Sequence, residues 1–102
     1  MPSEESSGGF MFRPKESASL GVLLAQGAAI VWSRHALERA DERGVSKLDA
    51  ERVIRRGRVT GLDVQADGQE RWRLAGQDED GHAFTVVLTP IAPDVLVVTV
   101  IT

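Results

Sequence analysis

Hydrophobic positions change their spacing near the middle of the chain. Up to about residue 57 they recur every three or four positions, and from residue 58 they form short runs that alternate with polar residues. The first pattern predicts helices over 15–26, between Ser33 and Gly44, and between Ser46 and Gly57. The second predicts strands over 59–64, 70–77, 82–89 and 95–101. Residues 28–32, before the second helix, are expected to form a short strand or an extended entry to that helix. We therefore expect an α+β fold, in which short N-terminal helices pack on a four-stranded antiparallel β-sheet.

The boundaries of the second and third helices carry capping residues. Ser33 and Ser46 are suited to accept a backbone N–H at a helix start, and Gly44 and Gly57 to end each helix in the left-handed conformation. The third helix is expected to turn its apolar side chains inward: Val45, Leu48, Val53 and Ile54.

The turns between the strands set their register. A three-residue loop at 79–81 gathers the large apolar residues on one face, pairing Trp72 with Leu88, Leu74 with Val86, and Gly76 with Phe84. A loop over 90–94 extends this face to the last strand, pairing Leu88 with Leu96, Val86 with Val98, and Phe84 with Val100.

This register places a mixed set of residues on the opposite face: Arg71, Arg73, Thr85, Thr89 and Thr99 with Val87, Val95, Val97 and Ile101. Thr85 and Thr99 become cross-strand neighbours. A half-apolar face is unsuited to open water, so we expect the first helix, another subunit or a protein partner to cover it.

Length and composition fit a single domain over 14–102, preceded by a loosely ordered segment over 1–13 that is rich in Ser, Gly and Glu. The absence of cysteine excludes disulfides and thiolate metal sites, and two distant histidines make no zinc site. We predict neither a metal nor a cofactor. The chain has no apolar run that would span a membrane and no export signal at its start, so a cytoplasmic location without membrane contact is expected.

Charge is unevenly distributed, although the net charge is only −3. Basic residues outnumber acidic ones over 34–58, and acidic residues dominate over 59–102. The basic segment supplies candidate nucleic-acid-binding residues: Arg43, Arg55, Arg56 and Arg58. A structural explanation competes with this one, because cations are favoured at the C-terminal end of a helix.

The best candidate for chemistry is the helix that follows Ser33. At 100° per residue, Arg39 lies about 40° and Arg43 about 80° from His35, so the three share one side. An imidazole flanked by guanidiniums suits a phosphate and a proton transfer. The same helix also offers ordinary salt bridges, such as that of Arg39 with Glu42.

The segment 33–46, with the pattern S-x-H-A-x-x-R-x-x-x-R-G-V-S, is followed by a second helix ending near Gly57 and by the strand Arg71-Trp-Arg-Leu. Together they resemble a bacterial family labelled as a domain of unknown function, whose members look like small relatives of the RelE and ParE toxins. The resemblance covers roughly 28–102. It implies two helices packed on an antiparallel sheet.

In the toxin relatives, the resemblance implies metal-independent RNA cleavage or inhibition of a protein target. Carried over by position, His35 would transfer the proton and Arg39 would steady the phosphate. Arg71 or Arg73 would neutralise developing charge, and Thr99 would orient an oxygen. The expected partners are RNA and an antitoxin or another protein, and self-association stays open.

Three functions follow from these observations. The first is a toxin-like ribonuclease. The second is a non-enzymatic module, encoded by a phage or mobile element, that binds a protein target through its sheet face. The third is sequence-tolerant nucleic-acid binding without cleavage.

Overall fold

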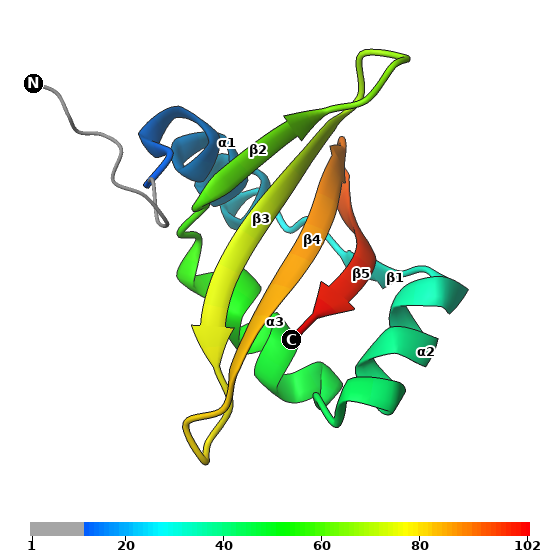
Figure 1. The fold of residues 1–102 in the computed structure, drawn as a ribbon. Helices are drawn as coiled ribbons and strands as arrows, with labels where there is room; N and C mark the ends of the chain where they lie inside the picture. The colour runs from blue at the N-terminus through cyan, green and yellow to red at the C-terminus, as the bar shows by residue number, and fades with distance from the viewer. Residues whose placement is uncertain (1–11) are drawn as a thin grey trace, which may run out of the picture.

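A five-stranded sheet forms the centre of the structure, a computed structural model that describes residues 12–102 (Figure 1). The strands lie in the order β1-β5-β4-β3-β2. Their bounds are β1 (Ile30–Trp32), β2 (Gly61–Val64), β3 (Glu70–Gln77), β4 (Ala83–Ile91) and β5 (Asp94–Ile101). The prediction for 1–13 concerns positions that, apart from Phe12 and Arg13, lie outside the described residues.

The predicted α+β class is confirmed, but the sheet has one strand more than the four antiparallel strands expected. The extra strand is β1, which runs parallel to β5. Its pairing is extended at both ends by backbone hydrogen bonds, because the Val95 N–H donates to the Ala29 carbonyl at 3.1 Å and the Ser33 N–H to the Val97 carbonyl at 3.1 Å. Part of the segment 28–32 therefore forms an edge strand of the sheet.

Three helices cover one face of the sheet: α1 (Pro14–Ala25), α2 (Arg34–Arg43) and α3 (Lys47–Arg56). In Figure 1, α1 and α3 lie behind the sheet and α2 stands beside β5. The predicted caps of α2 are present, since Ser33 Oγ accepts the Ala36 N–H at 3.0 Å and Gly44 has φ of 70°. Within the described part of the chain, no helix has both the length and the apolar character needed to cross a membrane.

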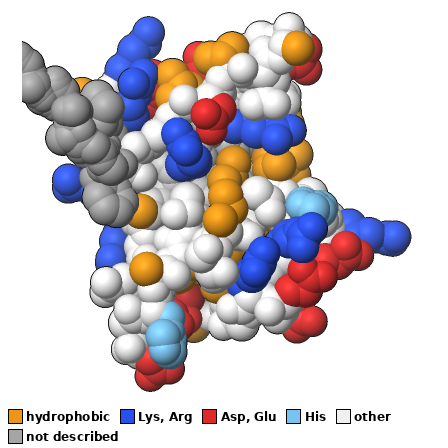
Figure 2. Space-filling model, in the orientation of Figure 1, with side chains coloured by type: hydrophobic (Ala, Val, Ile, Leu, Met, Phe, Trp, Pro, Cys, Tyr) orange, Lys and Arg blue, Asp and Glu red, His pale blue; other side chains and the backbone are white. Residues whose placement is uncertain are grey.

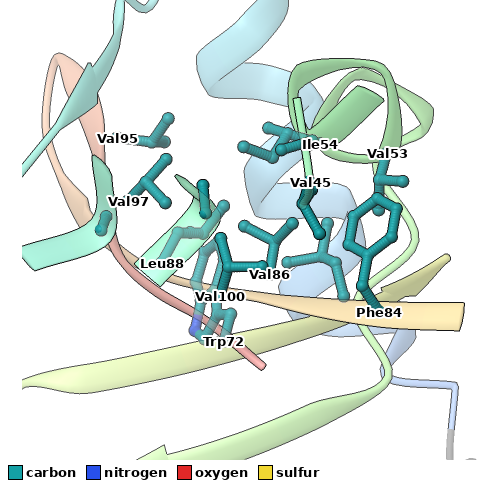
Figure 3. Close-up of a cluster of buried hydrophobic side chains, with 14 of the residues drawn as sticks. Val45, Val53, Ile54, Trp72, Phe84, Val86, Leu88, Val95, Val97 and Val100 are labelled. Atoms are coloured by element: carbon teal, nitrogen blue, oxygen red, sulfur yellow. The ribbon is translucent and has the colours of Figure 1, made fainter. Parts of the chain in front are cut away.

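The core lies between these helices and the sheet (Figure 3). Val53 and Ile54 of α3 point toward Phe84 and the other apolar side chains of the strands. The inward position predicted for Leu48 is wrong, because this side chain is 67% exposed. The buried stripe of α3 runs through Ala50, Val53 and Ile54, and a residue two positions before Ala50 lies about 200° around the helix from it.

The predicted register between β3 and β4 is confirmed, with Trp72 opposite Leu88 and Leu74 opposite Val86. The hairpin closes where the Asp78 N–H donates to the His82 carbonyl at 3.0 Å, which leaves the three-residue loop 79–81. The loop length was therefore sufficient to fix which face of each strand is buried.

The predicted register between β4 and β5 is wrong. Only Ala92 and Pro93 separate the two strands, and β5 carries a bulge. The observed pairs are Leu88 with Val97, Val86 with Val100, and Val87 with Thr99. Val95 and Val97 are consequently fully buried in the core and not on the opposite face, and Thr85 lies opposite Ile101 and not opposite Thr99.

The second face of the sheet is free of the three helices, so the expectation that the first helix covers it is wrong. Arg71, Arg73, Thr85 and Thr99 alternate with core residues along their strands and lie on this open face. Figure 2 looks onto it and shows hydrophobic side chains down the middle with Lys and Arg side chains on both sides. We refer to this surface as the open face.

Gly76 allows α3 to approach the sheet closely. A Cβ atom added at this position would overlap the Val53 side chain. We expect Gly76→Ala to lower the free energy of unfolding by about 1–3 kcal/mol, since an extra methyl group in a packed core forces its neighbours apart. Urea denaturation followed by circular dichroism measures this change.

Gly21 is the matched control, because it lies within α1 and a Cβ added there meets no atom within 4 Å. Gly21→Ala is expected to raise the free energy of unfolding by about 0.5–1 kcal/mol. Equal effects of the two substitutions would contradict the close packing inferred at Gly76.

Candidate functional site

A hollow of about 420 Å³ opens where the start of α2 meets the open face. Segments distant in the sequence line it: Ser33, His35, Gln69, Arg71, Thr89, Leu96, Val98 and Thr99. Three of the five predicted catalytic residues, His35, Arg71 and Thr99, thus share one hollow. We call it the His35–Arg71 hollow.

The bulge in β5 directs Thr99 into this hollow. Val87 pairs with Thr99 and Leu88 pairs with Val97, so Val98 is the extra residue. Side chains alternate along a strand, and without the extra residue a buried Val97 would turn Thr99 into the core as well. The bulge reverses the alternation, so that Val97 and the buried Val100 lie on one face and Thr99 on the other.

Ser33 fixes the start of α2 against the bulge. Its hydroxyl donates to the Val98 carbonyl at 3.3 Å and accepts the Ala36 N–H at 3.0 Å. The same residue therefore caps the helix and ties it to β5. His35 follows two positions later, at the exposed rim of the hollow.

Arg71 supplies the cation. Its Nε atom is buried, and it has no hydrogen-bond partner among the described residues. A buried donor without a partner costs free energy, and a carboxylate or phosphate oxygen is the acceptor that an arginine binds best. The hollow is therefore suited to hold an anion.

Thr89 forms the floor beside Arg71. It is 1% exposed, and its hydroxyl donates to the Glu70 carbonyl at 2.6 Å. This bond ties β4 to β3 at the residue next to Arg71, and it satisfies the threonine hydroxyl without using Arg71. Thr89 was not among the predicted site residues, although the confirmed pairing of Trp72 with Leu88 puts Thr89 opposite Arg71.

Two predicted residues do not line the hollow. Arg39 is bound to Glu42 at 2.7 Å on the surface of α2. Arg73 also lies on the open face, but its guanidinium extends over Gly61 of β2 and its Nε is 3.4 Å from a carboxylate oxygen of Asp63.

The candidate nucleic-acid-binding arginines are dispersed. Arg43 lies in the last turn of α2, and Arg55 and Arg56 lie in the last turn of α3, where the helix dipole favours cations. Arg58 differs from them, because it lines another hollow on the open face.

The turn at Asp78 brings three potential ligand groups together, since carboxylate oxygens of Asp78 and Asp80 and a ring nitrogen of His82 lie within 4.8 Å of one another. Asp78 Oδ1 accepts the backbone N–H groups of His82 at 2.8 Å and Asp80 at 2.9 Å. The hydrogen bond from the His82 N–H is the main cause that holds the pKa of Asp78 below its ordinary value. The carboxylate therefore stabilises the turn.

Fold and hollow together define an α+β protein with a cationic site on the open face of its sheet. A family model described as "Domain of unknown function (DUF4258)" matches residues 32–102, and the chain belongs to this family. The match includes every residue of the His35–Arg71 hollow and leaves α1 outside. No curated protein and no solved structure matches the chain.

The double role of Ser33 predicts a specific effect of Ser33→Ala. Loss of the cap and of the bond to Val98 is expected to lower the free energy of unfolding by about 1–2 kcal/mol. The backbone amide signals of Val98 and Thr99 should shift in a ¹⁵N–¹H NMR spectrum.

Ser46→Ala is the control, since Ser46 caps α3 through the Asp49 N–H. It should cost about 1 kcal/mol and leave the β5 signals in place. Unchanged Val98 and Thr99 signals in Ser33→Ala would contradict the proposed link between α2 and the bulge.

Proposed function

We propose that this protein is a small toxin-like ribonuclease of the RelE/ParE type, which cleaves RNA without a metal ion. The observation that carries the proposal is the convergence of His35, Arg71 and Thr99 on one open hollow. The three come from α2, β3 and β5, so their meeting is a product of the fold and not of sequence proximity.

In the proposed reaction a ribose 2′-hydroxyl attacks the adjacent phosphorus. His35 accepts the proton of that hydroxyl as the bond from the 2′-oxygen to phosphorus forms. The bond from phosphorus to the 5′-oxygen then breaks, the 5′-oxygen takes a proton from water, and a 2′,3′-cyclic phosphate is left. Arg71 stabilises the charge that develops on the phosphate oxygens, and Thr99 orients one of them.

The electrostatics of the hollow support this assignment. His35 and Arg71 are the only ionisable side chains among the described residues that line it, and none of these residues is a carboxylate. The buried Arg71 Nε has no protein acceptor among the described residues, so a phosphate oxygen would satisfy it.

Substitution of His35 and Arg71 tests the proposal. His35→Ala and Arg71→Ala should each lower the rate of cleavage of a synthetic RNA at least about 100-fold, the usual loss when a proton-transfer group or a charge stabiliser is removed. Expression of either variant should also relieve the growth arrest expected of the wild type. Circular dichroism should show that both remain folded.

Arg52→Ala is the matched control, because Arg52 is exposed on α3 and paired with Asp49 at 2.8 Å. Its cleavage rate should equal that of the wild type. Arg39→Ala and Arg73→Ala, whose side chains lie outside the hollow, should lose less activity than Arg71→Ala. Full activity in folded His35→Ala would refute the proposed chemistry.

A second candidate function is a non-enzymatic interaction module, and the apolar part of the open face favours it. Val31 is 45% exposed and Ile91 is 47% exposed, and both line a small hollow with Leu96. Their proximity to a cationic site suits an acidic, partly apolar protein partner such as an antitoxin. In this case His35 would be an ordinary exposed residue of α2 with no role in binding.

Aspartate substitutions at the exposed positions separate the two candidates. Val31→Asp with Ile91→Asp should abolish binding of one stoichiometric protein partner in a pull-down, since a charge would enter an apolar contact. His35→Ala should leave that binding intact. Val95→Asp and Val97→Asp are unsuitable, because both valines are fully buried in the core.

A further inference from the structure

A second hollow of the open face lies apart from the His35–Arg71 hollow and measures about 570 Å³. Ala75, Thr85 and Ile101 form its floor, on β3, β4 and β5. Phe12 and Arg58 border it from outside the sheet. We call it the Phe12–Arg58 hollow.

Phe12 and Arg58 form a stacked pair at this border. The Arg58 Cζ atom lies 4.9 Å from the centre of the Phe12 ring, and Phe12 is 49% exposed. The residues that follow them are joined, because the Arg13 N–H donates to the Val59 carbonyl at 2.8 Å. The main chain thus holds an aromatic ring and a guanidinium together at the surface.

The two hollows belong to one continuous surface. Thr99 lines the first and Ile101 the second, and two residues of a strand span about 7 Å. On β3, Arg71 lines the first hollow and Ala75 the second, with Arg73 between them on the same face. Arg71 and Arg58 therefore lie at the two hollows, and Arg73 between them is paired with Asp63.

We propose that the Phe12–Arg58 hollow is a nucleobase subsite for single-stranded RNA. The Phe12 ring stacks on a base, and the Arg58 guanidinium binds a phosphate of the same strand. The inference rests on the proposed function, since it places the cleaved phosphate of that strand at Arg71. A base must leave its helical stack to lie on Phe12, so a single strand and not a duplex is the ligand.

The subsite combines Phe12 with residues of the matched family domain. Phe12 lies outside the residues 32–102 that match the family, whereas Arg58, Thr85 and Ile101 lie within them. The segment before α1 therefore adds an aromatic surface to a face that the family domain supplies. Gln77 and Thr85 bring polar groups to the same hollow, where they are available to the edge of a base. The Thr60 hydroxyl, which also lines it, donates to the Arg73 carbonyl at 3.1 Å.

Binding of uncleavable RNA tests the subsite. The probes are a random-sequence 2′-O-methyl octanucleotide, measured by fluorescence anisotropy, and a 2′-O-methyl trinucleotide, measured by NMR titration. Phe12→Leu keeps apolar bulk without an aromatic ring and should weaken octanucleotide binding about tenfold. It should leave trinucleotide binding at the His35–Arg71 hollow unchanged. Phe12→Trp should restore octanucleotide binding.

The controls separate this inference from the proposed function. Leu48→Ala changes an exposed residue of α3 and should bind both probes as the wild type does. Arg71→Ala should weaken both probes. Wild-type affinity of Phe12→Leu for the octanucleotide, with weak binding by Arg71→Ala, would overturn the subsite and leave the proposed function in place.

The remaining outcomes are equally decisive. Weak binding by Phe12→Leu with wild-type binding by Arg71→Ala would support the subsite and contradict the role of Arg71. Failure of the wild type to bind either probe would overturn both proposals.

Discussion

The hydrogen bond from Ser33 to the Val98 carbonyl joins the two features on which the site depends. One is the start of α2, which carries His35, and the other is the bulge of β5, which turns Thr99 outward. Neither would define the hollow alone. A helix free of β5 would leave the imidazole without a fixed position, and a regular β5 would place the Thr99 hydroxyl in an apolar core, where it would need a partner.

The two faces of the sheet differ because the chain has only enough apolar residues to bury one of them. Three helices suffice to bury one face, and the other retains arginine and threonine side chains among valines. Val87 is only 6% exposed on that face, which indicates that neighbouring side chains cover it. A surface with arginines above an apolar floor can bind an anion and a flat apolar group side by side.

The sequence patterns predicted the local structure correctly, but they did not predict the register of β5. Capping serines and terminal glycines fixed the ends of α2 and α3, and the loop 79–81 fixed the register of β3 against β4. The error at β5 has two physical origins. The turn before it holds only Ala92 and Pro93 and not the expected residues 90–94. Every residue from Val95 to Val98 is apolar, so alternation gave no sign of an added residue. The expected convergence of His35, Arg71 and Thr99 survived it, because Thr99 lies beyond the bulge.

The position of β5 in the sheet affects the order in which the strands can pair during synthesis. It lies between β1 and β4, yet it is synthesised after both, so β1 has no strand to pair with until β5 has left the ribosome. Leu96, Val98 and Thr99 on β5 complete the wall of the His35–Arg71 hollow. A nascent chain without β5 therefore carries His35 and Arg71 but no assembled hollow, which is complete only once β5 has paired with β1 and β4.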